Sequence, residues 1–577
     1  MNILIIDGYV DEPSCLGVPP YLSPYPRYIY GLLKNFKYNI DYKTIDSLRK
    51  DFQFIFNNKN ISEEKKVSRN SHSKKSNDDL SGRHYDYIII IGGLSVPGKY
   101  LSTHPMTFKE ITFIISNFSN SKFILVGSLT RGWTIEGGKK PLPLDYSKFN
   151  LITSGNYLKQ IFDFFQGKET PSNNISYNKE LFACLGSEIV RHHHNYPNII
   201  CEIETYSGCL RQVKCSFCVE QFENFQSYRF PENIISEMSS LNNFGIVHFR
   251  LGNQPDIFGY GSTPENYKPN PYIIEKLFCG IRTSIPNIST LHTDNANPAI
   301  ISSFPEESKQ VIKSLVKYCT GGNVLALGCE SFDINVIREN NLNSTPQQSY
   351  NAVKIINELG SDISENGMPR LLPGVNLLFG LGGESEDTWK INYDFMLKLF
   401  NDGLLLRRIN IRQTIKFEGA FINQIVSKQN NKSKYIFEQY KKLIRENIDN
   451  EMLKKIAPLG RILKNLFAEK KDKYITYCRQ FGSYPILTGC ADEIITEKFH
   501  DMIIVNHGFR SITGLTYPIN INSIKYDSLK TISGVSKKIA NDIIYNRPFQ
   551  DIPSFFSIIP EHIRPVFETF KNYLSAK

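Results

Sequence analysis

The sequence predicts an α/β protein whose largest part is a barrel of parallel strands, closed or incomplete, preceded by a smaller α/β unit. Two series of apolar runs support this, three runs near the N-terminus and six between Asn198 and Thr414. Helical stretches separate the runs, and repeated strand–helix alternation implies parallel sheets with right-handed crossovers. Polar residues follow the strands of the second series, where barrel-type α/β folds keep their chemistry.

The N-terminal unit is predicted to cover residues 1–165. Its runs are continuously apolar and end near glycine, as expected of parallel strands that are buried on both faces. Few large apolar residues occur in 57–84, so this segment is expected to be a flexible insertion. The predicted strands are Asn2–Gly8, Asp86–Gly93 and Phe123–Ser128, and the segment Thr107–Phe118 has helical spacing.

The barrel is predicted over residues 196–425. Its six strands are Asn198–Thr205, Ile246–Gly252, Thr290–Pro298, Val324–Ser331, Gly374–Glu384 and Arg407–Thr414. Three smaller parts follow. They are a basic helical connector at 428–473 with 13 Lys and Arg against 6 Asp and Glu, a β-rich domain at 474–522, and a helical domain at 523–577.

Composition narrows the class of protein. The 577 residues are 41% hydrophobic, which is enough for packed cores and excludes a mainly disordered chain. A net charge of +10 permits contact with nucleic acid without requiring it. We find no apolar run near the ~20 residues of a membrane span and no signal-peptide pattern. We therefore expect a soluble, cytoplasmic protein without a membrane partner.

Three of the eleven cysteines lie within ten residues, at Cys209, Cys215 and Cys218, and the odd total argues against a disulfide framework. Their C-x5-C-x2-C spacing follows the first barrel strand, where three thiolates can bind three irons of a [4Fe–4S] cluster. A zinc site is an alternative, with a fourth ligand from His192–His194. Coincidental structural cysteines are another.

The cysteine motif and the strand order resemble the radical S-adenosylmethionine (SAM) superfamily. Phe217 fills the aromatic place before the third cysteine, whereas the first gap is two residues longer than usual. The resemblance implies a (β/α)6 partial barrel in which the fourth iron chelates SAM. It further implies reductive cleavage to a 5′-deoxyadenosyl radical and a ferredoxin- or flavodoxin-like reductant as partner.

The resemblance extends to residues at the strand ends. The second strand ends in LGNQPD, without the usual glutamate, and the fifth resembles the segment that packs against adenine, with Gly374 and Glu384 among its notable positions. Taken one at a time, each of these polar residues more often has a capping or structural role, and only their order on successive strands supports SAM binding. The implied SAM contacts are Phe217, Gly252, Asn253, Gln254, Glu330, Ser331, Asn376, Gly380 and Arg412.

An α/β domain before such a barrel resembles the flavodoxin-like, cobalamin-binding domains of many radical SAM enzymes. Bound cobalamin would imply methyl transfer to an unactivated carbon. The D-x-H-x-x-G motif that supplies a cobalt ligand is missing, although relatives without it bind the cofactor. The alternative is a degenerate domain that covers the barrel.

The segment 529–547 resembles a helix-hairpin-helix motif, which implies contact between backbone amides and nucleic-acid phosphate. Gly534, Ser536, Lys537 and Lys538 are the implied contacts, and packing between domains is the alternative. The β-rich part could be a small RNA-binding barrel, with Phe509 and Arg510 available.

The whole layout resembles a mainly archaeal group of radical SAM proteins with a C-terminal helix-hairpin-helix motif. Our main hypothesis is therefore an enzyme that generates a 5′-deoxyadenosyl radical and modifies nucleic acid, RNA or DNA, with an RNA base favoured. One alternative is a methyltransferase or a rearrangement acting on a small molecule or a protein. Another is a nucleic-acid-binding protein with a structural iron–sulfur or zinc site.

Overall fold

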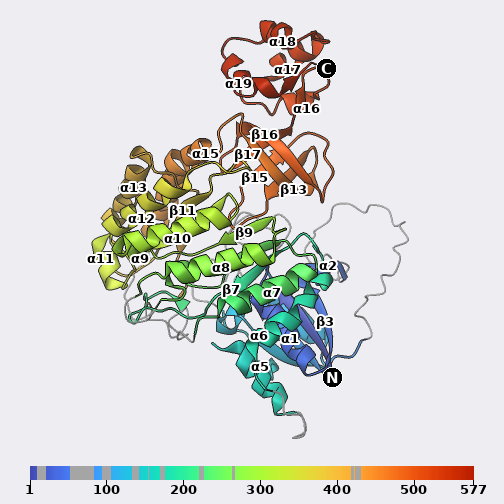
Figure 1. The fold of residues 1–577 in the computed structure, drawn as a ribbon, viewed down its shortest axis with the longest axis vertical. Helices are drawn as coiled ribbons and strands as arrows, with labels where there is room; N and C mark the ends of the chain where they lie inside the picture. Colours follow the sequence, from blue (N-terminus) through green and yellow to red (C-terminus); the bar gives the residue numbers. More distant parts are fainter. Residues whose placement is uncertain are drawn as a thin grey trace.

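The computed structural model describes residues 1–9, 21–51, 83–93, 105–132, 142–153, 155–168, 176–219, 227–262, 267–416, 422 and 431–576. The predicted α/β class with parallel sheets is confirmed. Along the long axis of Figure 1, the N-terminal sheet, the central strands, a small β-barrel and the C-terminal helices follow one another. The predicted insertion at 57–84 falls almost wholly outside the described residues.

The N-terminal sheet has five parallel strands in the order β3-β1-β4-β5-β6. This is the flavodoxin-like order, in which successive strands are added first on one side of β1 and then, from β4 on, on its other side. Helices α1 and α5 pack on one face, and α2 and α4 on the other. The elements are β1 (Asn2–Gly8), α1 (Pro24–Asn35), β3 (Asn39–Thr44), α2 (Ile45–Asp51), β4 (Tyr87–Gly92), α4 (Phe108–Asn117), β5 (Lys122–Val126), β6 (Leu151–Ile152) and α5 (Tyr157–Gln166).

The central part has two parallel sheets, β2-β7-β8-β9 and β10-β11-β12, joined by a bridge between Ala296 and Leu327. From β7 to β12, neighbours in space are neighbours in the chain. The strands are β2 (Tyr21–Leu22), β7 (Ile200–Glu204), β8 (His248–Gly252), β9 (Thr290–Thr293), β10 (Asn323–Glu330), β11 (Leu371–Phe379) and β12 (Arg408–Gln413). The connecting helices include α7 (Pro231–Asn243), α8 (Pro271–Ser284), α10 (Pro305–Tyr318), α11 (Ile334–Glu339), α12 (Pro346–Gly360) and α13 (Glu386–Asn401).

The N-terminal sheet and the central strands share one hydrophobic core. Helix α1 contacts β1 as well as β7, and α6 (Lys179–Leu185) packs beside it. Behind β7, the fully buried carboxylate of Glu237 pairs with Arg27 and Arg229. Charges this deep need such partners, because an isolated buried ion is very costly. The two parts therefore pack as one body.

The predicted helical connector at 428–473 is wrong in its last third. Helices α14 (Asn431–Ile444) and α15 (Asn450–Ile456) flank a π-helical turn, but Ile462–Asp472 is a strand, β13. Its three lysines and one glutamate favour a helix by intrinsic propensity. Pairing with two strands and burial of Leu463, Leu466 and Ala468 override that preference.

Strand β13 opens a closed barrel with the order β13-β14-β15-β17-β16, in which β15 and β17 run parallel. Numbered within the barrel, this is 1-2-3-5-4 with closure between the first and fourth strands, the topology of the OB-fold. The β-rich part therefore begins at residue 462 rather than at 474. The other strands are β14 (Ile475–Gln480), β15 (Leu487–Cys490), β16 (Phe499–His507) and β17 (Ser511–Thr516).

Four short helices end the chain and enclose their own core, which includes Leu529, Ile532, Val535, Ala540 and Ile543. Strands β18 (Ile519–Asn520) and β19 (Leu574–Ser575) tie the two ends of this part together. The helices are α16 (Tyr526–Leu529), α17 (Lys537–Tyr545), α18 (Ile552–Ile558) and α19 (Arg564–Glu568). In the described part of the chain, no helix has the length and apolar character to cross a bilayer.

Candidate functional site

The three clustered cysteines lie on the loop that follows the C-terminal end of β7. Cys209, Cys215 and Cys218 are each partly buried, and a backbone hydrogen bond of 3.2 Å joins the amide of Cys218 to the carbonyl of Cys215. None of the ten described cysteines forms a disulfide. The loop thus presents three thiols at the end of a parallel strand, the edge at which barrel folds carry their chemistry.

Asn340, just after α11, holds this loop in place. Its Oδ1 accepts from the Ser216 hydroxyl at 2.8 Å, and its backbone carbonyl accepts from the Ser216 amide at 3.1 Å. The same buried side chain bonds both backbone groups of Gly382, on the turn after β11. Cys215 and Phe217 also pack against the cluster that contains Leu378. The cysteine loop is therefore anchored to the C-terminal end of α11 and to the turn after β11.

The thiol of Cys215 is partly buried. Burial raises the pKa of its thiol to about 11, and the nearby charges of Glu330 and Cys209 add to the rise, whereas Arg211 opposes it. The guanidinium of Arg211 donates to the sulfur at 2.9 Å. A thiol binds metal as the thiolate, so a bound cation has to remove this proton. Arg211 already offers a positive partner to the sulfur.

No three His, Cys, Asp or Glu side chains in the described ranges stand together as a ready metal site. His193 is buried and its Nδ1 accepts from the Asn195 amide, while His194 bonds the Thr44 hydroxyl of the N-terminal sheet. The histidines of the zinc alternative are thus engaged elsewhere. Three thiolates on one loop suit iron–sulfur ligation by the nature of their donors, and metal binding commonly completes such a site.

The turn after β8 places Gly252, Asn253 and Gln254 beside the start of the cysteine loop. Asn253 has a left-handed backbone (φ 53°) and donates to the Glu204 carboxylate at 2.9 Å. Gln254 is buried, accepts from the Thr205 hydroxyl at 3.1 Å and donates to the Leu251 carbonyl. Both side chains brace the turn, so this turn offers a ligand mainly its backbone.

Glu330 ends β10 in a strained conformation. Its φ is 63°, in the left-handed region that side chains rarely adopt, and the strand pairing shifts just before it. Burial raises the pKa of its carboxyl to about 8, against the opposing charge of Arg412. Ser331 is buried and accepts from the Asp333 amide at the start of α11. Strain of this kind is found where a side chain is aimed at a functional site.

Strands β11 and β12 turn a polar face inward. Along β12, Arg408, Asn410 and Arg412 are partly exposed, whereas Ile409 and Ile411 between them are buried against the helices. Asn376 on β11 is likewise partly exposed between buried neighbours, and its side-chain oxygen accepts a hydrogen bond from Asn410 at 3.1 Å. Because side chains alternate along a strand, the inner face of these strands is polar and reachable by solvent.

The turn after β11 is held by its own carboxylate. Glu384 accepts from the amides of Gly380 and Leu381 at 2.8 and 3.1 Å. Burial raises the pKa of Glu384 to about 7, although these two bonds act in the opposite direction. Gly380 has φ 90°, which the tight turn requires. This fixes the segment that the resemblance assigns to adenine.

Sequence reasoning missed several inward residues. Arg250 on β8 contacts the carboxylates of Glu202 and Asp294, which come from the flanking strands β7 and β9. A charged residue inside an apolar strand is the signal that could have revealed Glu202 and Arg250. Asn340 and Tyr484 carry no such signal, because their partners are remote in the chain.

The predicted nucleic-acid residues lie on the C-terminal parts. Ser536 caps α17, with its hydroxyl accepting from the Ile539 amide, while Lys537 and Lys538 are exposed. Gly534 has φ 78° at the turn before the helix. In the β-barrel, Phe509 is 53% exposed and Arg510 pairs with Asp449 at 3.2 Å. The hairpin residues and the cysteine loop belong to separate regions of the molecule.

The C-terminal edge of the N-terminal sheet was tested as a corrinoid site. A Cβ at Gly8 would lie 2.7 Å from the Cβ of Met106, and one at Gly92 would lie 2.1 Å from Leu129. These glycines make room for the chain's own buried side chains. The described residues of this edge therefore give a corrinoid no cradle.

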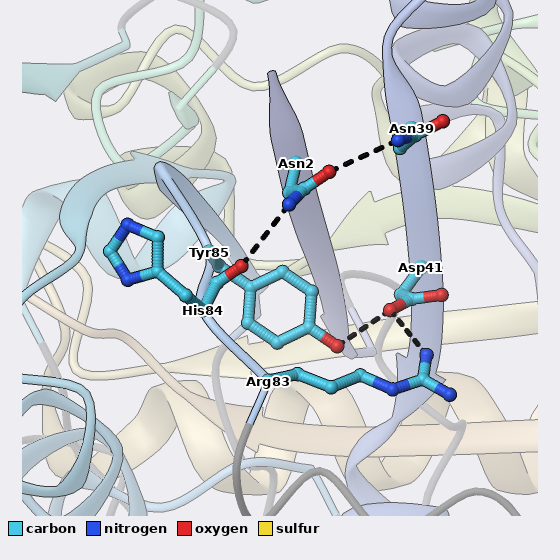
Figure 2. Close-up of a pocket in the computed structure, with 6 residues that line it drawn as sticks. All are labelled: Asn2, Asn39, Asp41, Arg83, His84 and Tyr85. Carbon is cyan, nitrogen blue, oxygen red and sulfur yellow. Dashed lines mark hydrogen bonds and ion pairs between the residues drawn. The ribbon is translucent and has the colours of Figure 1, made fainter.

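A polar hollow of about 300 Å³ lies at the opposite edge of the same sheet (Figure 2). Among the residues that line the hollow, Asp41 accepts a hydrogen bond from Tyr85 at 2.6 Å and pairs with Arg83 at 2.9 Å. The charge of Asp41 is therefore already balanced within the hollow. The remaining lining residues are Asn2, Asn39 and His84. It is separate from the cysteine loop.

Close relatives occur in archaea. The chain is 42% identical to "Uncharacterized protein MJ0274" of Methanocaldococcus jannaschii over 529 residues, 89% of this chain and 92% of the relative. It is 38% identical to an archaeal protein of Archaeoglobus fulgidus over 549 residues, 95% and 96% of the two chains. The chain belongs to the family of these two proteins. No protein-family model matches it.

Solved structures with some likeness are radical SAM enzymes. The methyltransferase TsrM from Kitasatospora setae, with cobalamin and a [4Fe–4S] cluster, gives a TM-score of 0.46 at 14% identity over 72% of each chain. The cobalamin-dependent radical enzyme OxsB gives 0.44 at 13%, over 79% of this chain and 56% of its own. Coproporphyrinogen III oxidase from Escherichia coli gives 0.32 at 13%, over 55% and 75%.

Proposed function

We propose that this protein is a radical SAM enzyme that holds a [4Fe–4S] cluster on Cys209, Cys215 and Cys218. The observation that carries the proposal is the anchored cysteine loop. Three thiols follow the C-terminal end of β7, and Asn340 joins their loop to the C-terminal end of α11 and to the turn after β11. In its bound form the cluster would supply an electron to SAM and so release a 5′-deoxyadenosyl radical.

The chain's own residues would bind and orient SAM on the inner face of the strands. The turn at Gly252–Gln254 and the strained Glu330 lie at strand ends, whereas Asn376 and Arg412 lie on the polar face of β11 and β12. Phe217 packs against the cluster of Leu378 and would shield one side from water. Gly380 and Ser331 would shape the turns that surround the nucleoside.

The test is anaerobic reconstitution with iron and sulfide, followed by dithionite and SAM, with 5′-deoxyadenosine measured by mass spectrometry. The triple Cys→Ala variant at 209, 215 and 218 should lose both iron and product. A matched triple variant at Cys184, Cys279 and Cys319 should keep both, since these cysteines lie away from the loop. A cluster-loaded wild type without product would instead support a structural iron–sulfur site in a binding protein.

The proposed substrate is nucleic acid, with an RNA base favoured. In support, the barrel of β13–β17 has the OB topology, which often binds oligonucleotides. The start of α17 exposes Lys537 and Lys538 beside the turn at Gly534, in the manner of a helix-hairpin-helix motif. Binding of a labelled tRNA or single-stranded RNA should weaken with salt and in Lys537→Ala/Lys538→Ala. Absence of binding at low salt would overturn this part.

A second candidate substrate is a small molecule or a protein side chain, modified by methyl transfer or rearrangement. The placement of the OB barrel favours it, because Phe481 contacts Ile200 and His248 at the N-terminal ends of the central strands. The cysteine loop follows the opposite ends. Nucleic acid held by the C-terminal parts would have to extend around the strands. Product formation from a small-molecule extract free of nucleic acid would favour this second candidate.

We also propose a cytoplasmic location and a ferredoxin- or flavodoxin-like reductant. Both rest on the oxygen-sensitive, low-potential chemistry that the cluster would need. Replacement of dithionite by reduced ferredoxin or flavodoxin in the same assay tests the reductant, and failure of both would exclude this class of donor. We propose no cobalamin contact for the described residues beside Gly8 and Gly92, because Met106 and Leu129 fill the space there.

A further inference from the structure

The loop between β14 and β15 of the OB barrel, residues 481–486, reaches the central strands. Its first residue, Phe481, packs its ring 4.5 Å from that of His248 at the start of β8. The amide of Ser483 donates to Nδ1 of His292 on β9 at 2.9 Å. His248 and His292 are both buried, so this contact is dry. The loop therefore contacts the first residue of β8 and the third of the four residues of β9.

Tyr484 extends further along the inner face. Its hydroxyl donates to the carboxylate of Asp294, just past the end of β9, with distances of 2.9 and 3.0 Å to the two oxygens. The guanidinium of Arg408 lies 3.9 Å from the centre of the tyrosine ring. Arg407 donates to the carbonyl of Tyr484. One side chain of the OB barrel thus bonds at the far end of β9 and stacks against β12.

From Tyr484, a chain of contacts leads to the turn assigned to SAM. Asp294 pairs with Arg250, and Arg250 lies 3.6 Å from the Glu202 carboxylate. The Glu202 carboxylate packs directly against Gly252, because a Cβ at Gly252 would lie only 2.0 Å from Oε1 of Glu202. Every member of this chain is buried or nearly so.

We propose that loop 481–486 is the floor of the catalytic strands and that Tyr484 is a positioning residue for the Gly252–Gln254 turn. The hydroxyl fixes Asp294, Asp294 fixes Arg250, and Arg250 keeps Glu202 under Gly252. The OB barrel is then part of the catalytic unit, and SAM and substrate share the entrance at the cysteine loop. The inference rests on the proposed function for its kinetic consequence, whereas the contacts that it names stand without it.

The kinetic test compares Tyr484→Phe with Tyr474→Phe in the reconstituted enzyme. Tyr484→Phe keeps the ring under Arg408 and removes only the hydroxyl, while Tyr474 is 61% exposed on the β13–β14 turn and serves as the matched control. For Tyr484→Phe we expect the KM for SAM to rise about tenfold with little change in kcat, as for the loss of one hydrogen bond to a charged group. Iron content should stay at the wild-type level.

A second measurement separates this inference from the proposed function. Hydrogen–deuterium exchange of the protein without SAM should become about tenfold faster in peptides covering 248–254 for Tyr484→Phe. Tyr474→Phe should leave those peptides unchanged. This outcome depends on the contacts alone, so it supports the floor even if the wild type cleaves no SAM.

A double-mutant cycle completes the test. Asp294→Asn should reproduce the exchange effect of Tyr484→Phe, and the double variant should be no worse than the stronger single one, because both act through one bond. Unchanged exchange at 248–254 in Tyr484→Phe, or strictly additive effects in the double variant, would overturn the proposal. An unchanged KM with accelerated exchange would overturn its kinetic part and leave a purely structural floor.

Discussion

Replacement of Asn340 by alanine should release the cysteine loop. The side chain is fully buried and bonds the Ser216 hydroxyl, both backbone groups of Gly382 and the Val336 carbonyl. In the variant, the Val336 carbonyl still accepts a hydrogen bond from the backbone amide of residue 340, and the Ser216 hydroxyl can rotate toward another partner. The amide and carbonyl of Gly382 are left without these bonds. At about 1–2 kcal/mol for each orphaned group, the cost is about 2–4 kcal/mol.

Two assays check this value and its consequence. Urea unfolding of the iron-free protein measures the loss of stability, and iron content after reconstitution measures the loop's ability to bind a cluster. Asn340→Ala should lower both, while Asn335→Ala, an exposed asparagine on the same helix, should lower neither. A variant Asn340→Ala that loses under 1 kcal/mol and loads iron normally would refute the role given to this residue.

Three further predictions follow from the charges. Glu384 has a pKa of about 7 in the fold and a lower one in the unfolded chain, so its burial destabilises the protein increasingly as pH rises from 5 to 8. Glu384→Gln should therefore gain stability over the wild type across that range, by up to about 3 kcal/mol in urea titrations; a constant difference would contradict it. Glu237→Ala should lower the free energy of unfolding by about 3–5 kcal/mol, because it leaves two buried arginines without their carboxylate. Glu232→Ala removes only an exposed ion pair and should not shift the midpoint of urea unfolding. Equal losses of stability in the two variants would contradict this prediction. Lys537→Ala/Lys538→Ala should lower the salt dependence of RNA binding by about two units of log–log slope, and an unchanged slope in filter binding would exclude these contacts.

The positions of the buried strands along the sequence were predictable, because each strand has a local pattern of apolar residues. Runs such as Asn2–Gly8 and Tyr87–Gly92 are apolar throughout, as strands covered on both faces must be. Strand β13 was missed for the converse reason. The buried Leu466 and Ala468 alternate with more exposed neighbours, but the buried Leu463 is out of step with them, because the pairing with β16 shifts between Leu463 and Leu466. Sequence periodicity alone does not report such a shift.

The cysteines could be predicted because their ligand spacing is itself local. The residues that hold them are set by contacts between distant parts of the chain. Ser216 and Asn340 are 124 positions apart, and Tyr484 and Asp294 are 190 apart. Asparagine and tyrosine are common in loops, so neither stands out before the fold brings it to its partner. The predicted SAM contacts Gln254 and Ser331 show the opposite case, since the structure engages both in bracing their own turns.

The two ends of the central strands differ in a way that constrains the chemistry. At the C-terminal ends, the cysteine loop, the Gly252–Gln254 turn and Glu330 are partly exposed or strained, as residues that await a ligand often are. At the N-terminal end of β8 and within β9, Phe481 and Ser483 form closed contacts with buried histidines. Parallel sheets place their ligands at the carboxyl ends of the strands, so closure of the other end costs no access. It does give the inner face a rigid base on that side. These contacts explain why the OB barrel packs against the central strands, in addition to the nucleic-acid binding that we propose for it.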